Sequence, residues 1–139
     1  MAKNFIWKAQ QVYKKVEQQA ERALTRGSIL ILNKAKALMK EPKSGEDYRG
    51  KGRGKKKGAK RFKTRSSAPG QAPAVQTGRL RASLAHVKPA PLTRHVGTNL
   101  AYGFFLEKGT KRGLAERPFL RPAFKSERPK IVKMLRGKL

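Results

Sequence analysis

Small and apolar side chains recur near the start of the chain at steps of three or four positions. This spacing puts them on one face of an α-helix, which turns once every ~3.6 residues. The stripe consists of Val12, Val16, Ala20, Ala23, Gly27, Ile31, Ala35 and Leu38. It predicts one long helix over residues 4–40, with Asn4 as its N-cap. Pro42 should mark its end, because proline disfavours helical geometry in the residue before it.

The predicted helix is long for a chain of 139 residues. At a rise of about 1.5 Å per residue it would reach roughly 55 Å, which is more than a compact domain of this size needs. We therefore expect either that part of the helix packs on another subunit or that it breaks near Gly27.

Residues 43–65 have a different composition. They contain eleven basic side chains against Glu46 and Asp47, with glycines between them and almost nothing apolar beyond Tyr48 and Phe62. Such a segment buries too little apolar surface to form a core. Together with the Ser- and Pro-containing stretch that follows, it predicts a long flexible insertion over residues 43–73.

The pattern changes again after Thr77, where two short segments are rich in β-forming residues. Residues 80–87 and 93–98 are joined across Pro89 and Pro91, which predicts an antiparallel hairpin.

The last third of the chain is predicted to be mainly helical. Residues 101–107 fit either a short helix or a strand, and Gly109 should end that element. A helical pattern runs from Pro118 to the end of the sequence, and Pro122 suits its first turn. Pro129 lies inside the pattern and is expected to kink or split the helix.

These elements predict an α+β fold in a single domain of residues 1–139. Residues 1–42 would form the long helix, 43–73 the flexible basic insertion, and 74–139 a small antiparallel β-sheet with the C-terminal helix. The long N-terminal helix and the C-terminal helix would both pack on the sheet. The large side chains expected in the core are Tyr102, Phe105, Leu106, Phe119 and Leu120.

The net charge of +27 implies an anionic partner. The basic side chains proposed to contact a polyanion, either DNA or an acidic protein surface, are Lys51, Arg53, Lys55, Lys56, Lys57, Lys60 and Arg61. Basic residues interleaved with glycine bind phosphates through charge without reading bases. The alternative is a solvated loop that only keeps the protein soluble.

Catalysis has little support, because the chain holds eight carboxylates, two histidines and no cysteine. His86 and His95 lie on the two arms of the predicted hairpin and could approach each other across the strands, but no third metal ligand accompanies them. The sequence GEDYRGKG has the glycine spacing of a phosphate-binding loop, but Gly52 replaces the Ser or Thr that should follow Lys51. We expect no enzyme, no metal and no cofactor.

A membrane partner is also not expected. The N-terminal sequence lacks the apolar region of a signal peptide, and the apolar run at residues 29–32 is too short to cross a bilayer.

Three sequence blocks in the second half carry a family resemblance: VQTGRLRASL, then VGTNLAYGFFLEKGT, then ERPFLRPAF. In this order and spacing they resemble the tail-completion, or neck, proteins of long-tailed double-stranded DNA bacteriophages, which include head–tail joining and minor tail proteins. The matching residues are Thr77, Gly78, Arg79, Leu80, Arg81, Tyr102, Glu107, Gly109, Thr110, Pro118, Phe119, Leu120 and Pro122. We interpret Glu107 as a structural acid that pairs with Arg79 or Arg81, and Gly78 and Gly109 as turn residues.

The resemblance implies a subunit of a homo-oligomeric ring, hexameric or twelvefold, at the junction of the head connector and the tail tube. Its partners would be head-closure, tail-terminator and tail-tube proteins, with non-specific contact to genomic DNA. The protein would be assembled in the host cytoplasm and located in the neck of the virion. The alternative is a non-specific nucleic-acid-binding protein that acts through its basic loop.

Overall fold

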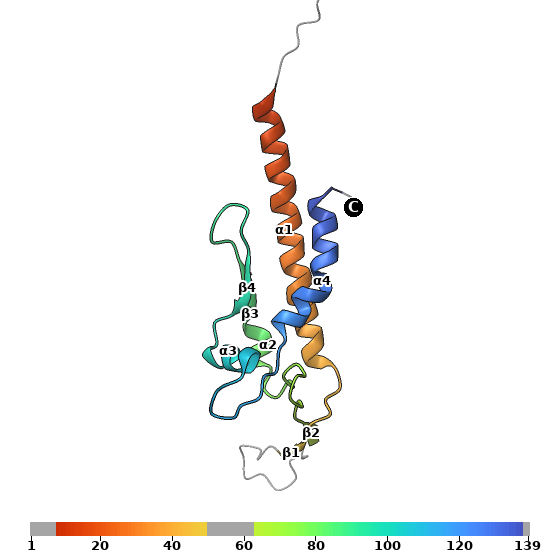
Figure 1. Ribbon diagram of the computed structural model, residues 1–139, viewed down its shortest axis with the longest axis vertical. Helices are drawn as coiled ribbons and strands as arrows, with labels where there is room; N and C mark the ends of the chain where they lie inside the picture. Colours follow the sequence, from red (N-terminus) through yellow and green to blue (C-terminus); the bar gives the residue numbers. More distant parts are fainter. Residues whose placement is uncertain (1–7, 50–62, 138–139) are drawn as a thin grey trace, which may run out of the picture.

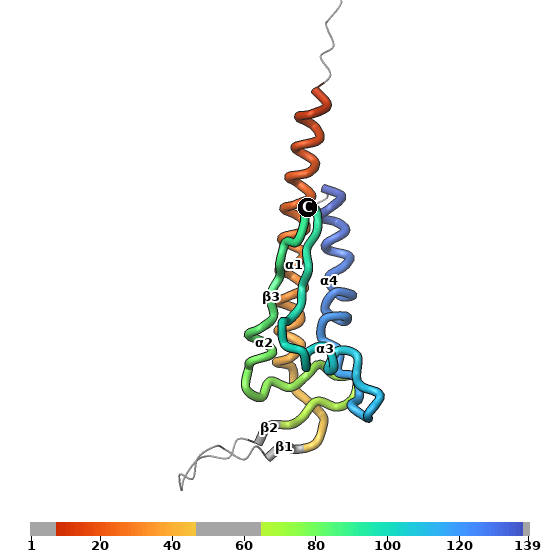
Figure 2. Tube along the Cα trace, turned by 90° about the vertical axis from the view of Figure 1, so that its left-hand side faces the viewer, coloured from red at the N-terminus to blue at the C-terminus, as the bar shows by residue number. Residues whose placement is uncertain are grey.

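The computed structural model describes residues 8–49 and 63–137. In chain order the elements are α1 (Ala9–Lys40), β1 (Asp47–Arg49), β2 (Lys63–Arg65), α2 (Arg79–Ser83), β3 (Leu84–Val87), β4 (His95–Thr98), α3 (Ala101–Lys108) and α4 (Leu120–Leu135). Helix α4 runs beside α1, and the β3–β4 hairpin packs on another side of α1 (Figures 1 and 2). The predicted α+β arrangement is therefore confirmed.

Helix α1 is continuous over 32 residues and ends at Lys40, two residues before Pro42. The expected break near Gly27 is absent. Gly27 is instead buried where α4 approaches, because a Cβ atom at this position would lie only 3.0 Å from Cγ1 of Ile131. The glycine therefore permits close helix packing. Asn4, the proposed N-cap, lies outside the described residues, and α1 begins later than predicted, at Ala9 with Lys8 in the N-cap position.

Helix α4 begins as expected, with Pro122 in its first turn, but Pro129 does not split it. Proline lacks the N–H that would donate to the carbonyl four residues earlier, at Lys125. Both residues are exposed, so water can bind the carbonyl oxygen that loses its donor. The expected split is therefore not seen.

The predicted hairpin is present, although it is shorter than expected. Strands β3 and β4 pair antiparallel, with Leu84 opposite Thr98. The first part of the predicted strand is instead the short helix α2. Gly78 directs the chain into this helix with a φ of 75°, a left-handed conformation that suits glycine. The backbone N–H of Arg79 donates to Oγ1 of Thr77 over 3.4 Å, as expected for a turn threonine.

The hairpin register keeps the two histidines apart. His86 lies opposite Val96, whereas His95 lies opposite Val87. Neighbouring positions of a strand point to opposite faces of a sheet, so the two imidazoles face away from each other. The expected approach of His86 and His95 across the strands is therefore wrong.

The apolar core lies between the C-terminal half of α1, the start of α4, and β3. Its buried members are Ala35, Met39, Ala72, Leu84, Phe119 and Ala123. Leu106 and Leu120 are partly buried against this cluster, as expected. Tyr102 and Phe105 are 43% and 47% exposed, so the prediction of these two as core residues is wrong. Helix α3 turns Gly103 and Leu106 inward, which leaves its aromatic side chains outside.

Residues 66–73, which the composition placed in a flexible insertion, are packed against the folded part. Ser67 and Ala72 are buried. Oε1 of Gln71 accepts hydrogen bonds from the backbone N–H groups of Ser44 and Ala68, over 3.2 and 3.1 Å. The short strands β1 and β2 also pair antiparallel. The two ends of the predicted insertion thus bond to each other and tie residues 66–73 to the folded part, which composition does not reveal.

Candidate assembly surfaces and polyanion contacts

The first turns of α1 extend beyond the end of α4 (Figure 1). Its apolar side chains Val12, Tyr13 and Val16, here called the uncovered stripe, are 53%, 75% and 60% exposed. The stripe continues the helix face that is buried further along α1, where Ala23 is 5% exposed and Gly27 is buried. Other parts of the chain thus cover this amphipathic face over only part of the length of α1.

A second apolar surface is formed by α3. Tyr102, Phe104 and Phe105, here called the α3 aromatic face, are 43%, 58% and 47% exposed. The rings of Phe104 and Phe105 meet edge to face with their centroids 5.8 Å apart. The ammonium group of Lys108 lies 5.3 Å from the centroid of Phe104. Exposed aromatic clusters of this kind are typical of protein contact sites.

Glu107 joins the end of α3 to the start of α4. Its Oε2 atom accepts hydrogen bonds from the backbone N–H groups of Phe119 and Leu120, at 2.8 and 3.0 Å, and Oε1 accepts from that of Arg121 at 2.8 Å. These donors belong to the first turn of α4 or the residue before it, where N–H groups have no partner within the helix. A carboxylate here also meets the positive end of the helix dipole.

The charge partner of Glu107 is Arg121, whose Nε atom lies 3.6 Å from Oε1. The expected pairing with Arg79 or Arg81 is therefore wrong. Glu107 contacts mainly backbone N–H groups at the start of α4, and the spacing of residues in the sequence did not predict these contacts. The second and third sequence blocks meet at this contact, since Phe119 and Leu120 belong to the third.

Gly109 and Thr110 shape the loop between α3 and α4. Gly109 has a φ of 71°, and a Cβ atom there would lie 2.7 Å from the backbone oxygen of Leu114. The backbone N–H of Thr110 donates to this oxygen over 2.9 Å, and the N–H of Leu114 donates to Oγ1 of Thr110 over 3.2 Å. Pro118 follows in the same loop and is partly buried. The loop returns the chain so that α4 starts beside Glu107.

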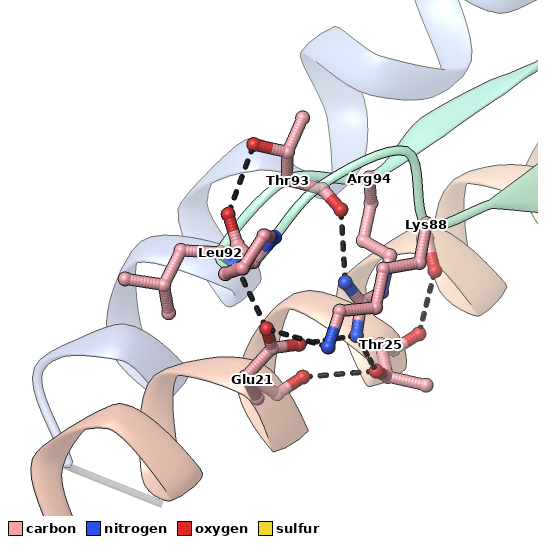
Figure 3. A network of polar contacts seen from close by, with 8 residues as sticks. Glu21, Thr25, Lys88, Leu92, Thr93 and Arg94 are labelled. Carbon is pink, nitrogen blue, oxygen red and sulfur yellow. Dashed lines mark hydrogen bonds and ion pairs between the residues drawn. The ribbon is translucent and has the colours of Figure 1, made fainter. Parts of the chain in front are cut away.

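Glu21 links α1 to the tip of the β3–β4 hairpin (Figure 3). Its carboxylate pairs with Lys88 at 2.9 Å and with Arg94, and it accepts the backbone N–H of Leu92 at 2.8 Å. Arg94 also donates to Oγ1 of Thr25 over 2.9 Å. We call this arrangement the Glu21 clamp.

The clamp strongly favours the ionised carboxylate. The hydrogen bond from Leu92, the contact with Lys88 and the charge of Arg94 together lower the pKa of Glu21 to about 2, against an opposing effect of desolvation. Leu92 itself has a φ of 54°, which is unusual for a residue with a side chain. Sequence analysis did not identify the clamp. The only sequence feature that pointed to Glu21 was its rarity, as one of eight acidic residues in a basic chain.

Basic side chains also line a hollow of about 500 Å³ at the C-terminal end of α1, here called the α1 hollow. Its lining residues are Met39, Lys40, Glu41, Lys43, Arg65, Ala74, Val75 and Arg81. Nζ of Lys43 donates to the backbone oxygen of Leu38 over 2.7 Å, and burial lowers the pKa of this lysine. Arg81 was singled out as a family-motif residue, and the other basic lining residues were not singled out individually.

The basic residues proposed from sequence for polyanion contact all lie in the part of the chain outside the described residues. They are Lys51, Arg53, Lys55, Lys56, Lys57, Lys60 and Arg61. Within residues 8–49 and 63–137, no three His, Asp or Glu side chains are grouped so that they could hold a metal ion. In the same part of the chain, no helix combines the length and apolar character needed to cross a membrane.

Comparison of the chain with protein-family models, with curated proteins and with solved structures gave no match.

Proposed function

We propose that the chain is a structural ring subunit of the neck of a long-tailed bacteriophage, joining the tail tube to the head connector beside the DNA channel. The proposal combines the resemblance of the three sequence blocks with one structural observation. This observation is the amphipathic face of α1, which is buried around Ala23 and Gly27 but continues uncovered through Val12 and Val16. A helix face of this kind is suited to packing on a neighbouring subunit.

The uncovered stripe and the α3 aromatic face are different surfaces of one chain. When two unlike surfaces of identical subunits meet, association runs head to tail and produces a closed ring if the rotation closes. The proposed ring is hexameric or twelvefold. Its neighbours would be head-closure, tail-terminator and tail-tube proteins. Self-repulsion at a net charge of +27 opposes ring closure by the isolated chain, so acidic partners or DNA would favour assembly.

The test introduces mutations into the genome that encodes the chain, so that side chains of the uncovered stripe are replaced. Val12→Glu with Val16→Glu places two charges in the proposed interface, whereas the control Gln11→Glu with Gln18→Glu places the same charges on the opposite side of the helix. All four positions are exposed, so both variants should fold. We expect separate heads and tails in electron micrographs of the first variant and joined particles in the control.

Joined, infectious particles that lack the chain altogether would contradict the proposed function. An antibody label on the interior of filled heads, with none at the head–tail junction, would instead favour the alternative of a non-specific nucleic-acid-binding protein. The basic lining of the α1 hollow is the observation that keeps this alternative open.

A further inference from the structure

The α1 hollow brings together basic residues that are far apart in the sequence. We propose that it binds a phosphate group of a duplex nucleic-acid backbone, as a contact site in the folded part of the chain and separate from the basic loop. This inference assigns the DNA contact of the proposed function to a site in the folded part of the chain, and it rests on that proposed function.

The lining of the α1 hollow is mainly basic. Lys40 ends α1, Arg65 ends β2, and Arg81 lies in α2, yet all three line one hollow. With Lys43 they make four basic residues among the described residues that line the hollow, and Glu41 is the acidic residue of that set. An arginine guanidinium presents a planar set of donors that matches phosphate oxygens, and lysine adds a compact positive charge. The hollow thus offers charge-assisted donors from several directions.

The hollow lies at the C-terminal end of α1, where unpaired carbonyl groups carry partial negative charge that opposes anion binding. Part of this charge is already neutralised, since Nζ of Lys43 donates to the carbonyl oxygen of Leu38 over 2.7 Å. Lys40 lies in the last turn, where a cation also offsets the dipole. The partial negative charge at this end of α1 is therefore partly offset by Lys40 and Lys43.

The remaining lining residues favour a backbone phosphate over a base. Met39, Ala74 and Val75 are apolar, and among the side chains that the structure describes none that lines the hollow is aromatic. Proteins that hold single strands usually stack bases on aromatic rings, whereas duplex contacts without base reading depend on phosphates. We expect binding that prefers duplex over single strand and is independent of sequence.

The experiment measures binding of the purified full chain to a short fluorescent DNA duplex, with salt varied from about 50 to about 200 mM. Lys40→Gln with Arg81→Gln removes two charges from the hollow. The control, Lys14→Gln with Lys125→Gln, removes two exposed charges that do not line it. Circular dichroism and thermal melting of both variants establish that they are folded before binding is compared.

Loss of one phosphate contact should weaken binding of the hollow variant about tenfold and reduce the slope of log affinity against log salt by about 0.9. The control should keep the wild-type slope. Equal affinities and slopes for two folded variants would overturn the proposal. If the hollow variant does not fold, Arg81→Lys serves instead. It keeps the charge but loses the planar donor set, and should bind DNA less tightly than wild type.

Two further arms identify the source of the anion. Inorganic phosphate that stabilises the wild-type chain but does not compete with DNA would place free phosphate, and not nucleic acid, in the hollow. Polyglutamate that binds as tightly as DNA and depends equally on Lys40 and Arg81 would assign the hollow to an acidic protein. Either result overturns the inference. These assays use the isolated chain, so they are independent of whether heads and tails join.

Discussion

Replacing Glu107 by alanine should destabilise the fold at the start of α4. The carboxylate holds three backbone N–H groups of the residues that open α4, at 2.8, 3.0 and 2.8 Å. Phe119, which supplies the first of these donors, is 0% exposed, so water has little access to replace the lost oxygen atom. Arg121 is exposed, and water can take over at its N–H group.

The size of the effect follows from these contacts. Removing a side chain that caps a helix costs about 0.5–2 kcal/mol, and leaving a buried donor without a partner costs about 1–3 kcal/mol. Since the two costs overlap, we expect the free energy of unfolding to fall by about 2–3 kcal/mol. With an unfolding entropy of about 2.1 cal/mol/K per residue, this lowers the melting temperature by about 7–10 °C.

Thermal melts and urea titrations followed by circular dichroism provide the assay. Glu107→Gln keeps one acceptor oxygen and should lose less stability than Glu107→Ala. Arg121→Ala removes exposed ion pairs with Glu107 and Glu116 and a hydrogen bond to the backbone oxygen of Glu107, and should cost about 1 kcal/mol or less. A Glu107→Ala protein that melts within about 2 °C of wild type would refute the reasoning, because this shift corresponds to less than one ordinary hydrogen bond.

Two further predictions concern the contacts of α1. The folded pKa of Glu21, about 2, lies below its ordinary value of 4.5, so the Glu21 clamp should add stability above about pH 4.5 and lose it as the pH falls towards 2. Acid titrations of unfolding should show this component in the wild type and not in Glu21→Gln; parallel curves would contradict it. Gly27→Leu should lower stability by about 1–3 kcal/mol in urea titrations, because its side chain would overlap Ile131. A melting temperature at or above that of the wild type would show that α4 can move aside.

Local patterns in the sequence were sufficient wherever a short stretch of chain decides its own conformation. The stripe from Val12 to Leu38 identified a helix, and Pro42 identified its end, because side-chain spacing and proline geometry act within one or two turns. Gly78 and Gly109 were recognised as turn residues for the same reason, and both have the left-handed φ that glycine accepts at little cost. The hairpin was also found, although the helical turn α2 replaced its first residues.

Only the tertiary structure decided which residues become partners. Glu107 was expected beside Arg79 or Arg81, but the fold places it against backbone N–H groups 12 to 14 residues further on. Glu21 meets Arg94 at a separation of 73 residues. Tyr102 and Phe105 are as apolar as core residues, yet the orientation of α3 leaves them exposed. Hydrogen bonds, ion pairs and burial depend on distances in space, and a spacing pattern specifies such distances only within one helix or one strand pair.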